Sequence, residues 1–277
     1  MAGHLYIVAT PIGNLGDITK RAIEILQQVD LIAAEDTRRS KILLEHFAIS
    51  SEIIAYHEHN ENKLTPKLIK YLDSGKSIAL ISDAGTPLIN DPGYKLVISA
   101  HDKDIKVIPI PGVSAVITGL SVSGIPCNKF IFEGYLPSKT ISRKKYLKTL
   151  ITESRTLVFY EAPHRISELI DDMCIIFGSS RRIAIARELT KKHEQILQGT
   201  LSSIKLKIET GEIKNKGEFV VLVEGEQENL ICNSEIQRIN HILLEKLSPK
   251  DAIKLTAQIT KKKKNDIYKL VVENDKT

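Results

Sequence analysis

The sequence predicts an α/β protein with two α/β lobes and a small helical module at its C-terminal end. Short apolar runs rich in β-branched residues alternate with longer stretches of helical periodicity as far as Ile108. The alternation resumes after Pro109 in a less regular form, and beyond Asn233 the periodicity is helical only. Strands that alternate with helices in this way usually form a mostly parallel sheet with helices on both faces.

We assign the first lobe to residues 1–112. Its expected strands are Leu5–Ala9, Leu31–Ala34, Ile53–Ala55, Ser77–Ser82 and Ile105–Ile108. Its expected helices are Ile18–Gln28, Arg38–Phe47, Leu64–Leu72 and Gly93–Ala100. In the first helix the apolar residues between Ile18 and Val29 recur at helical spacing, so one face should lie against the sheet.

We assign the second lobe to residues 113–226, after the turn at Pro109–Val113. Its expected strands are Phe130–Glu133, Thr156–Tyr160, Arg182–Ala186, Glu194–Gln198 and Glu218–Val223. Its expected helices are Ser114–Ser121, Arg143–Ile151, His164–Phe177 and Ser202–Ile208. The later strands follow one another with less helix between them, which predicts a mixed sheet.

The C-terminal module is assigned to residues 234–277, beyond the polar linker Glu226–Asn233. Its expected helices are Ser234–Leu247, Pro249–Ile259 and Asn265–Val272. Ser248 is placed to cap the second helix, because Pro249 suits a first helical position. Three short helices of this kind suggest a module that resembles a helix-turn-helix.

Composition excludes several classes of protein. The chain has 277 residues, of which 42% are hydrophobic, and no apolar run approaches the ~20 residues of a membrane span. The N-terminal MAGHLYIVATPIG lacks a basic segment followed by an apolar one, so we expect no signal peptide and a cytoplasmic protein. Cys127, Cys174 and Cys232 form no CxxC pair, which indicates free thiols rather than a disulfide framework or a zinc site.

The formal net charge of +5 is concentrated in two regions. Residues 234–277 hold ten Lys/Arg against six Asp/Glu, and Ser138–Lys148 holds five Lys/Arg and no acid. Such regions suit a polyanionic partner, although a solvated helix face and a lysine-rich tail explain them equally well.

Ligands of open α/β sheets bind beyond the carboxyl ends of the strands, and two unusual loops lie there early in the chain. Thr10–Asn14 is a turn with Pro and Gly, but the chain contains neither GxGxxG nor GxxxxGK[ST], so no Rossmann or P-loop site is expected. The second loop, Ala34–Arg39, brings two acids and two arginines to the start of a helix, where Thr37 is the expected N-cap.

Two more such loops follow. Asp83 ends a buried strand, and the turn residues from Gly85 to Gly93 exceed what a plain connection needs. Phe159–Arg165 combines an acid, a histidine and an arginine after another strand. The pair His57 and His59 has no third ligand at suitable spacing, so zinc is not expected.

Together these loops resemble one family. The stretches that carry the resemblance are VATPIGNLGDIT, AAEDTRRSKILL, YHEHNE, SDAGTPLINDPGY, PGVSAVITGLSVSG, EGYLP, FYEAPHR and ARELTKKHE. They are similar to the 16S ribosomal RNA cytidine-2′-O-methyltransferase branch of the tetrapyrrole-methylase superfamily, over essentially the whole chain. In much of that superfamily the first loop reads Gly-Pro-Gly-Asp, whereas Thr10-Pro-Ile-Gly-Asn14 here fits the RNA-modifying branch.

The resemblance implies a dimeric enzyme of the class III methyltransferase type, with S-adenosylmethionine held in a trough between the lobes. It implies methylation of a ribose 2′-hydroxyl in the decoding region of 16S rRNA, with the rRNA or the 30S subunit as partner. Residues expected at the cofactor are Pro11, Asp83, Ala84, Gly85, Thr86, Ser114, Ala115, Tyr160, Ala162 and Pro163.

Methyl transfer to a weakly nucleophilic hydroxyl is helped by a general base. Glu35, Asp36 and Glu161 are the candidates, with Asp36 as first choice, and Arg38 or Arg165 is expected to orient a flanking phosphate. Asp36→Asn is accordingly predicted to lower turnover by at least ~10²-fold. The expected RNA-binding residues are Arg39, His57, Arg143, Lys144, Lys145, Arg165, Arg187 and Lys191.

Two alternatives stay open at this point. One is methylation of a tetrapyrrole precursor in the same trough. The other is a non-catalytic rRNA-binding assembly protein with a relict pocket, which would bind no S-adenosylmethionine. The C-terminal helices could hold RNA, serve the dimer or only stabilise the chain.

Overall fold

The computed structural model describes residues 3–226, 233–260 and 262–272. The chain divides into two compact units, with the division between Glu226 and Gln227. Both predicted lobes therefore belong to the first unit, and the helical module is the second. Lys261 and residues 273–277 of the predicted module lie outside the described residues, as do Cys232 and most of the predicted linker.

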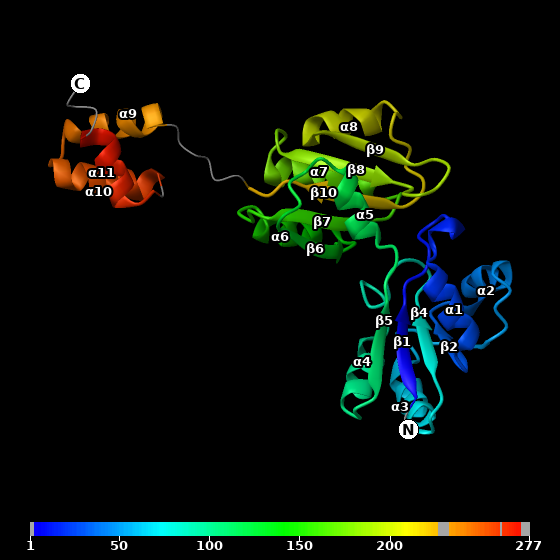
Figure 1. Ribbon diagram of the computed structural model, residues 1–277. Coiled ribbons are helices and arrows are strands. Elements are labelled where there is room, and N and C mark those ends of the chain that lie inside the picture. The colour runs from blue at the N-terminus through cyan, green and yellow to red at the C-terminus, as the bar shows by residue number, and fades with distance from the viewer. Residues whose placement is uncertain (1–2, 227–232, 261, 273–277) are drawn as a thin grey trace. The chain divides into compact units, whose positions relative to one another are not determined.

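The first sheet contains five parallel strands in the order β3-β2-β4-β1-β5 (Figure 1). Its strands are β1 (His4–Val8), β2 (Leu31–Ala34), β3 (Glu52–Ala55), β4 (Ile78–Ile81) and β5 (Lys106–Ile110). The central strands β2 and β4 are buried at every position, as expected of strands with helices on both faces. The predicted parallel sheet is confirmed.

Helices cover both faces of this sheet. They are α1 (Lys20–Gln28), α2 (Thr37–His46), α3 (Glu61–Asp73) and α4 (Tyr94–His101), and a short 3₁₀ helix, η1 (Leu15–Asp17), precedes α1. Leu26 of α1 and Leu44 of α2 pack in one core with Ile32, while Leu72 of α3 and Leu96 of α4 pack in the other.

The second sheet has the order β6-β7-β10-β8-β9 and is mixed, as predicted. Its strands are β6 (Phe130–Tyr135), β7 (Thr156–Glu161), β8 (Arg182–Arg187), β9 (Gln195–Thr200) and β10 (Phe219–Val223). Only β6 and β7 run parallel to each other, and the remaining pairs are antiparallel. The predicted two-sheet α/β architecture is therefore confirmed.

The two faces of the second sheet are covered differently. One face carries α6 (Thr140–Thr149), α7 (Ile166–Phe177) and α8 (Leu201–Glu209), whose apolar side chains form the largest core. The other face carries α5 (Ala115–Val122). Ile12, from the loop after β1, packs into the core under α5 together with Leu120 and Val220. A first-lobe loop thus helps to cover the second sheet.

The second unit contains α9 (Asn233–Leu244), α10 (Pro249–Thr260) and α11 (Lys264–Val272). Ile236, Ile253 and Ile267, one from each helix, form its core. The Ser248 hydroxyl accepts a hydrogen bond from the Asp251 amide at 3.3 Å, which confirms the predicted N-cap of α10. None of the described helices in either unit combines the length and apolarity that crossing a membrane requires.

Candidate active site between the two sheets

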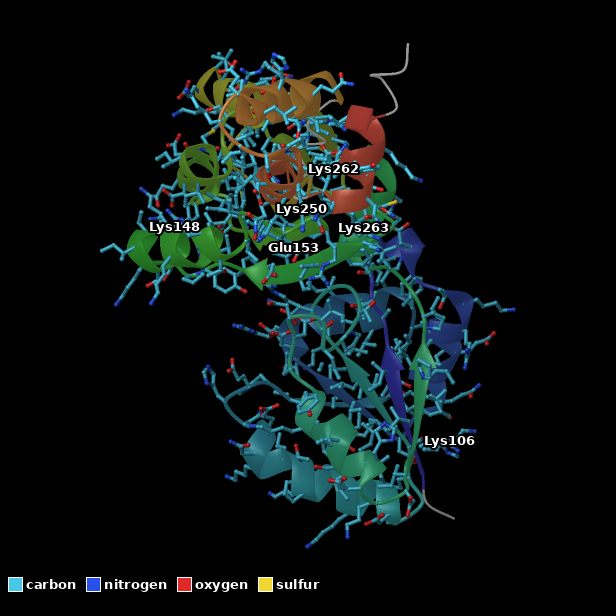
Figure 2. The ribbon with its side chains drawn as sticks, turned by 90° about the vertical axis from the view of Figure 1, so that its left-hand side faces the viewer. Lys106, Lys148, Glu153, Lys250, Lys262 and Lys263 are labelled. Carbon is cyan, nitrogen blue, oxygen red and sulfur yellow. The ribbon has the colours of Figure 1, made fainter. Side chains whose placement is uncertain are left out.

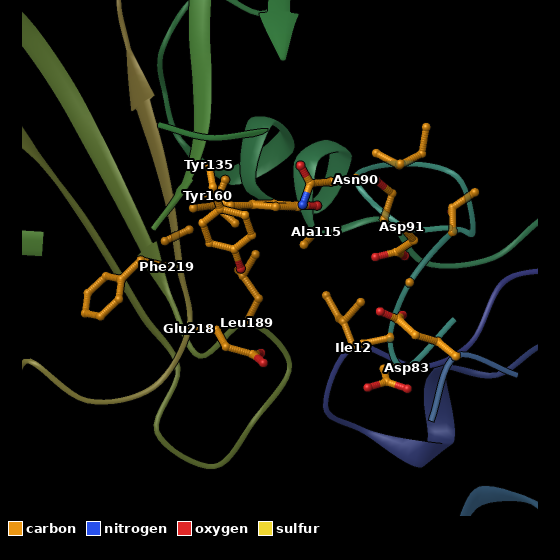
Figure 3. A pocket seen from close by; sticks show the side chains of 18 of the residues that line it. Ile12, Asp83, Asn90, Asp91, Ala115, Tyr135, Tyr160, Leu189, Glu218 and Phe219 are labelled. Carbon is orange, nitrogen blue, oxygen red and sulfur yellow. The ribbon is translucent and has the colours of Figure 1, made fainter. Parts of the chain in front are cut away.

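A cavity of about 260 Å³ lies in the first unit and takes its walls from both sheets (Figure 3). The first lobe contributes the loops after β1, β2 and β4, which are the loops at the carboxyl ends of its strands. The lining residues are Ile12, Glu35, Arg39, Asp83, Ala84, Gly85, Thr86, Ile89, Asn90, Asp91, Ser114, Ala115, Tyr135, Tyr160, Ala186, Leu189, Glu218, Phe219 and Val220.

The floor of the cavity is two loops joined by their backbones. The Thr10 amide donates to the Gly85 carbonyl at 2.8 Å, and the Gly85 amide donates to the Thr10 carbonyl at 3.0 Å. The Thr10 hydroxyl also donates to the Ser82 carbonyl at 3.2 Å. These bonds hold the turn after β4, which lines the cavity from Asp83 to Thr86, against the turn after β1, which lines it with Ile12.

Gly85 is needed for its backbone conformation. Its φ is +84°, which side-chain-bearing residues rarely adopt, and a Cβ there would lie 3.4 Å from Cγ2 of Ile12. Thr86 then donates its hydroxyl to the Val113 carbonyl at 3.1 Å, which attaches the loop to the junction between the lobes. Four non-glycine residues in or next to the lining have a positive φ, namely Leu88, Asn90, Glu188 and Thr190.

Four carboxylates line the cavity, and Arg39 is its one basic lining residue among the residues that the structure describes. Asp83 accepts the Asp36 amide and an Arg39 Nη1 hydrogen, both at 3.0 Å. Burial, together with the nearby charge of Asp83, raises the pKa of Glu35. Burial also raises the pKa of Asp91 to about 6.

Aromatic side chains form the wall on the second-lobe side. The rings of Tyr135 and Tyr160 are 5.7 Å apart, and Phe132 meets Tyr160 edge to face at 4.9 Å. Burial raises the pKa of Tyr160 to about 12, so its hydroxyl is neutral at pH 7. A register shift between Phe132 and Gly134 precedes Tyr135, and a bulge of this kind re-aims the side chain that follows it.

A second cavity of about 830 Å³ adjoins the first on the first lobe. Its lining residues are Glu35, Asp36, Thr37, Arg38, Arg39, Ala55, His57, Glu58, His59, Glu61, Asp83, Asn90, Asp91, Pro92, Gly93, Tyr94 and Lys95. Glu35, Arg39, Asp83, Asn90 and Asp91 line both cavities, so the two spaces share one wall.

Asp36 lines only the second cavity and is held in place. Its carboxylate caps α2 by accepting the Arg38 amide at 2.9 Å. The Arg38 guanidinium also donates to it at 3.1 and 2.8 Å, and these bonds hold the pKa of Asp36 well below its usual range. The prediction that Thr37 caps this helix is wrong, since Asp36 takes that position and Thr37 is the first helical residue.

The structure brings seven of the ten expected cofactor residues to the first cavity. Pro11, Ala162 and Pro163 do not line either cavity. Glu161 does not line either cavity, and it is only 1% exposed. Its carboxylate accepts the Ala162 amide at 2.8 Å and lies 3.3 Å from Nε of Arg165. The Arg165 guanidinium in turn donates to the Leu136 carbonyl at 2.8 Å.

Two residues that were expected to bind RNA are buried, and their assignments are corrected. Arg143 is 1% exposed and donates to Asp172 at 2.7 Å and to Glu168 at 3.1 Å. Arg187 is 7% exposed and donates to the Lys216 carbonyl at 2.6 Å. A guanidinium enclosed in this way cannot reach an RNA phosphate, so both assignments are wrong.

The other six expected RNA-binding residues are distributed. Arg39 and His57 line the cavities, and Lys145 is exposed on α6. Lys144 lies 3.3 Å from Asp172, while Lys191 bonds Glu188 and Glu218 at 2.9 and 2.8 Å. Arg165, already described, supports a loop. In the helical module, Lys250 and Lys263 are exposed, and their side chains are labelled in Figure 2.

The sequence alone did not identify Tyr135, Asn90, Asp91, Leu189 or Glu218 as site residues. Asn90 and Asp91 belong to the turn that follows Asp83, where they read only as turn formers. Tyr135 lies in EGYLP and Leu189 in ARELTKKHE. These motifs indicated the right segments, but they did not show which of their side chains face the cavity.

Comparison with protein-family models gives two matches. The model of the Tetrapyrrole (Corrin/Porphyrin) Methylases matches residues 4–205. The model of the RsmI C-terminal HTH domain matches residues 232–275. Together the two models span both units.

Curated relatives match over nearly their full length. A protein of Xylella fastidiosa (strain Temecula1) called ribosomal RNA small subunit methyltransferase I is 49% identical over 267 residues, which cover 96% of this chain and 98% of the relative. The protein of the same name from Escherichia coli O157:H7 is 46% identical, covering 98% of this chain and 95% of the relative.

Solved structures share the fold at low identity. A cobalt precorrin-4 methyltransferase aligns with a TM-score of 0.60 and 15% identity, covering 80% of this chain and 94% of that one. A uroporphyrin-III C-methyltransferase of Thermus thermophilus, complexed with S-adenosylhomocysteine, aligns with a TM-score of 0.56 and 14% identity, covering 80% and 97%.

Proposed function

The chain belongs to the tetrapyrrole (corrin/porphyrin) methylase family, and we propose that it is an S-adenosylmethionine-dependent methyltransferase of small-subunit ribosomal RNA. The observation that carries this proposal is the near-full-length identity of 46–49% to relatives of that name. We further propose that the methyl group goes to the 2′-hydroxyl of a cytidine ribose in the decoding region of 16S rRNA.

The first cavity suits S-adenosylmethionine. Its carboxylates complement a sulfonium and an ammonium group, and the joined turns of Thr10 and Gly85 form its floor. Asp83, Ser114 and Tyr160 would be among the residues that hold it. When bound, it supplies an activated methyl group: as the new O–C bond forms, the C–S bond breaks and its electron pair stays on sulfur.

The chain's remaining task is to position the ribose and to manage its proton. The second cavity is polar and has six carboxylates in its lining, three of which pair with its cations Arg38, Arg39 and Lys95. These three cations are the groups in it that would contact the phosphates of a nucleic-acid strand. The exposed lysines of α6 and of the helical module would add sequence-independent attraction for RNA.

The tetrapyrrole alternative is disfavoured by the relatives. Those that are 46–49% identical over nearly the whole chain are named for ribosomal RNA, whereas the corrin and porphyrin methyltransferases that share the fold are 14–15% identical. We therefore retain RNA as the substrate class. We also propose a cytoplasmic homodimer, for which the exposure of Ile117 (55%) and Val122 (41%) on α5 is the support, with light scattering as its test.

The experiment uses the purified chain, labelled S-adenosylmethionine, and either 30S subunits lacking the modification or uroporphyrinogen. We expect label in 16S rRNA at a 2′-O-methyl cytidine, located by ribose-methylation mapping. Label in the porphyrinogen would support the alternative, and label at a base would overturn the 2′-O assignment. Absence of cofactor binding by calorimetry would favour the non-catalytic assembly protein.

A further inference from the structure

The wall shared by the two cavities is where a ligand in one space meets a ligand in the other. Three carboxylates stand on it, namely Glu35, Asp83 and Asp91. If the first cavity holds the methyl donor and the second the RNA strand, the accepting hydroxyl lies beside this wall. These three carboxylates are therefore placed to take its proton.

Asp83 is already engaged. One of its oxygens accepts the Asp36 amide and the other accepts Arg39, each at 3.0 Å. Both oxygens of Asp83 are therefore occupied, and a substrate hydroxyl would have to displace the Asp36 amide or the Arg39 guanidinium to bond it. Glu35 lies beside Asp83 and is influenced by the charge of Arg39 as well.

Asp91 differs from Asp83 in having no such partner. Within the described part of the chain, neither its carboxylate nor that of Glu35 has a lysine, arginine or histidine nitrogen within 4 Å. The Ser82 hydroxyl is the hydrogen-bonding neighbour of Asp91, whereas Glu35 accepts the Asp83 amide. Asp91 also lies nearer the second lobe, because its charge acts on both Tyr135 and Tyr160. In Figure 3 it extends from the first-lobe side toward the space that Tyr160 faces from the other side.

The backbone around Asp91 is fixed on both sides. Asn90 has a φ of +69°, and its Oδ1 lies against Gly134, where a Cβ would come within 2.6 Å of it. Gly93 has a φ of +131°, and a Cβ there would lie 2.6 Å from Cδ2 of Leu80. The close approach at both positions restricts the backbone that carries Asp91, and a positive φ at a non-glycine residue such as Asn90 is common at active sites.

We propose that Asp91 is the general base, which accepts the proton of the ribose 2′-hydroxyl as that oxygen is methylated. The inference rests on the proposed function. The proton moves from the 2′ oxygen to a carboxylate oxygen of Asp91 as the O–C bond forms, and it leaves to water after the product departs. Asp91 therefore replaces Asp36, whose carboxylate is occupied by Arg38, as the preferred base.

Electrostatics suit this role. The groups that face Asp91 are Glu35 and Asp83 from the first lobe and Tyr135 and Tyr160 from the second, with Arg39 on the same wall. Burial and the two acidic neighbours bring the pKa of Asp91 to about 6, close to the pH at which a base works best. The carboxylate is then mostly ionised at pH 7 yet retains useful basicity.

The test compares Asp91→Asn with Asp102→Asn, which removes a charge from the exposed end of α4 outside both cavities. Single-turnover methylation of 30S subunits is measured against pH, and cofactor affinity by calorimetry. With S-adenosylmethionine at a concentration that the calorimetry shows to be saturating, we expect Asp91→Asn to lower the rate by at least ~10²-fold and to abolish the fall in rate below about pH 6. Asp102→Asn should match the parent protein.

A rate for Asp91→Asn within about threefold of the parent, with the acidic limb intact, would overturn the proposal. Carboxyl ¹³C NMR of the parent protein gives a second readout that does not depend on how the variant folds. An Asp91 carboxyl that titrates near 6 supports the proposal, and one that titrates below about 4.5 contradicts it. Failure of the parent itself to methylate any ribose would instead defeat the proposed function.

Discussion

The main chains of Thr10 and Gly85 exchange two hydrogen bonds, of 2.8 and 3.0 Å, although 75 positions separate the two residues in the sequence. This bridge joins the loop after β1 to the loop after β4. It holds together the floor of the first cavity, and it depends on a glycine with a positive φ.

Gly85→Ala should reduce both stability and cofactor affinity. Alanine at a φ of +84° costs about 1 kcal/mol in backbone strain, and its Cβ, in van der Waals contact with Ile12 at 3.4 Å, would add a methyl group to the lining of the cavity. We expect the free energy of unfolding in urea to fall by about that amount and the Kd for S-adenosylmethionine to rise about tenfold.

Gly211→Ala is the matched control for that change. Gly211 has a φ of +77°, and a Cβ at this position would have no described atom within 4 Å, so the strain is similar but no part of the cavity is disturbed. Its cofactor affinity should be unchanged. Equal loss of affinity in both variants would mean that strain, and not the cavity floor, controls binding.

Arg143→Ala should destabilise the fold rather than weaken RNA binding. The side chain is 1% exposed and joins Asp172 and Glu168, so its removal leaves the buried Asp172 with the partly exposed Lys144, 3.3 Å away, as its remaining ion-pair partner among the described residues. The expected cost is about 3 kcal/mol in the free energy of unfolding, measured by urea titration.

Lys145→Ala supplies the comparison, because that side chain is exposed on the same helix. It should leave stability within about 0.5 kcal/mol and lower the slope of log affinity against log salt for 16S rRNA by up to about one. A reduced salt slope for a folded Arg143→Ala protein would contradict our account of the buried pair.

Asp91→Asn should stabilise the protein above neutral pH. A carboxyl whose folded pKa is about 6, against an ordinary 3.8, binds more protons in the folded state between those values. The contribution of the Asp91 carboxyl to the free energy of unfolding is therefore greatest below about pH 4, and it is lost as the pH rises through 6. The variant should exceed the parent by about 1–3 kcal/mol at pH 7.5 and lose that advantage near pH 4. Urea titrations at the two pH values measure the difference.

Asp36→Asn should retain most of its activity. Asparagine caps a helix as well as aspartate does, so α2 should still begin correctly. We expect single-turnover rates within about tenfold of the parent, which revises the larger loss that the sequence suggested. A loss of 10²-fold or more with intact cofactor binding would return Asp36 to the position of general base.

Local chemistry decided most of the fold. Alternating apolar runs and helical periodicity located each strand and helix to within a few residues, because burying such faces leaves few arrangements. The turn residues after Asp83 likewise pointed to the correct edge of the first sheet. Periodicity could not show that Arg143 faces inward, since its acidic partners Glu168 and Asp172 lie on another helix.

The sequence by itself determined the two-lobed α/β class, the helical appendage and the loops from which the site is built, since each follows from residues close together in the chain. Only the tertiary structure decided which side chains share a wall. Residues distant in the sequence make Asp91 different from Asp83 and Asp36. Arginines pair with Asp83 and Asp36, whereas Asp91 is buried beside other acidic side chains. Proton affinity depends on charge and solvent in three dimensions, and no local pattern encodes them.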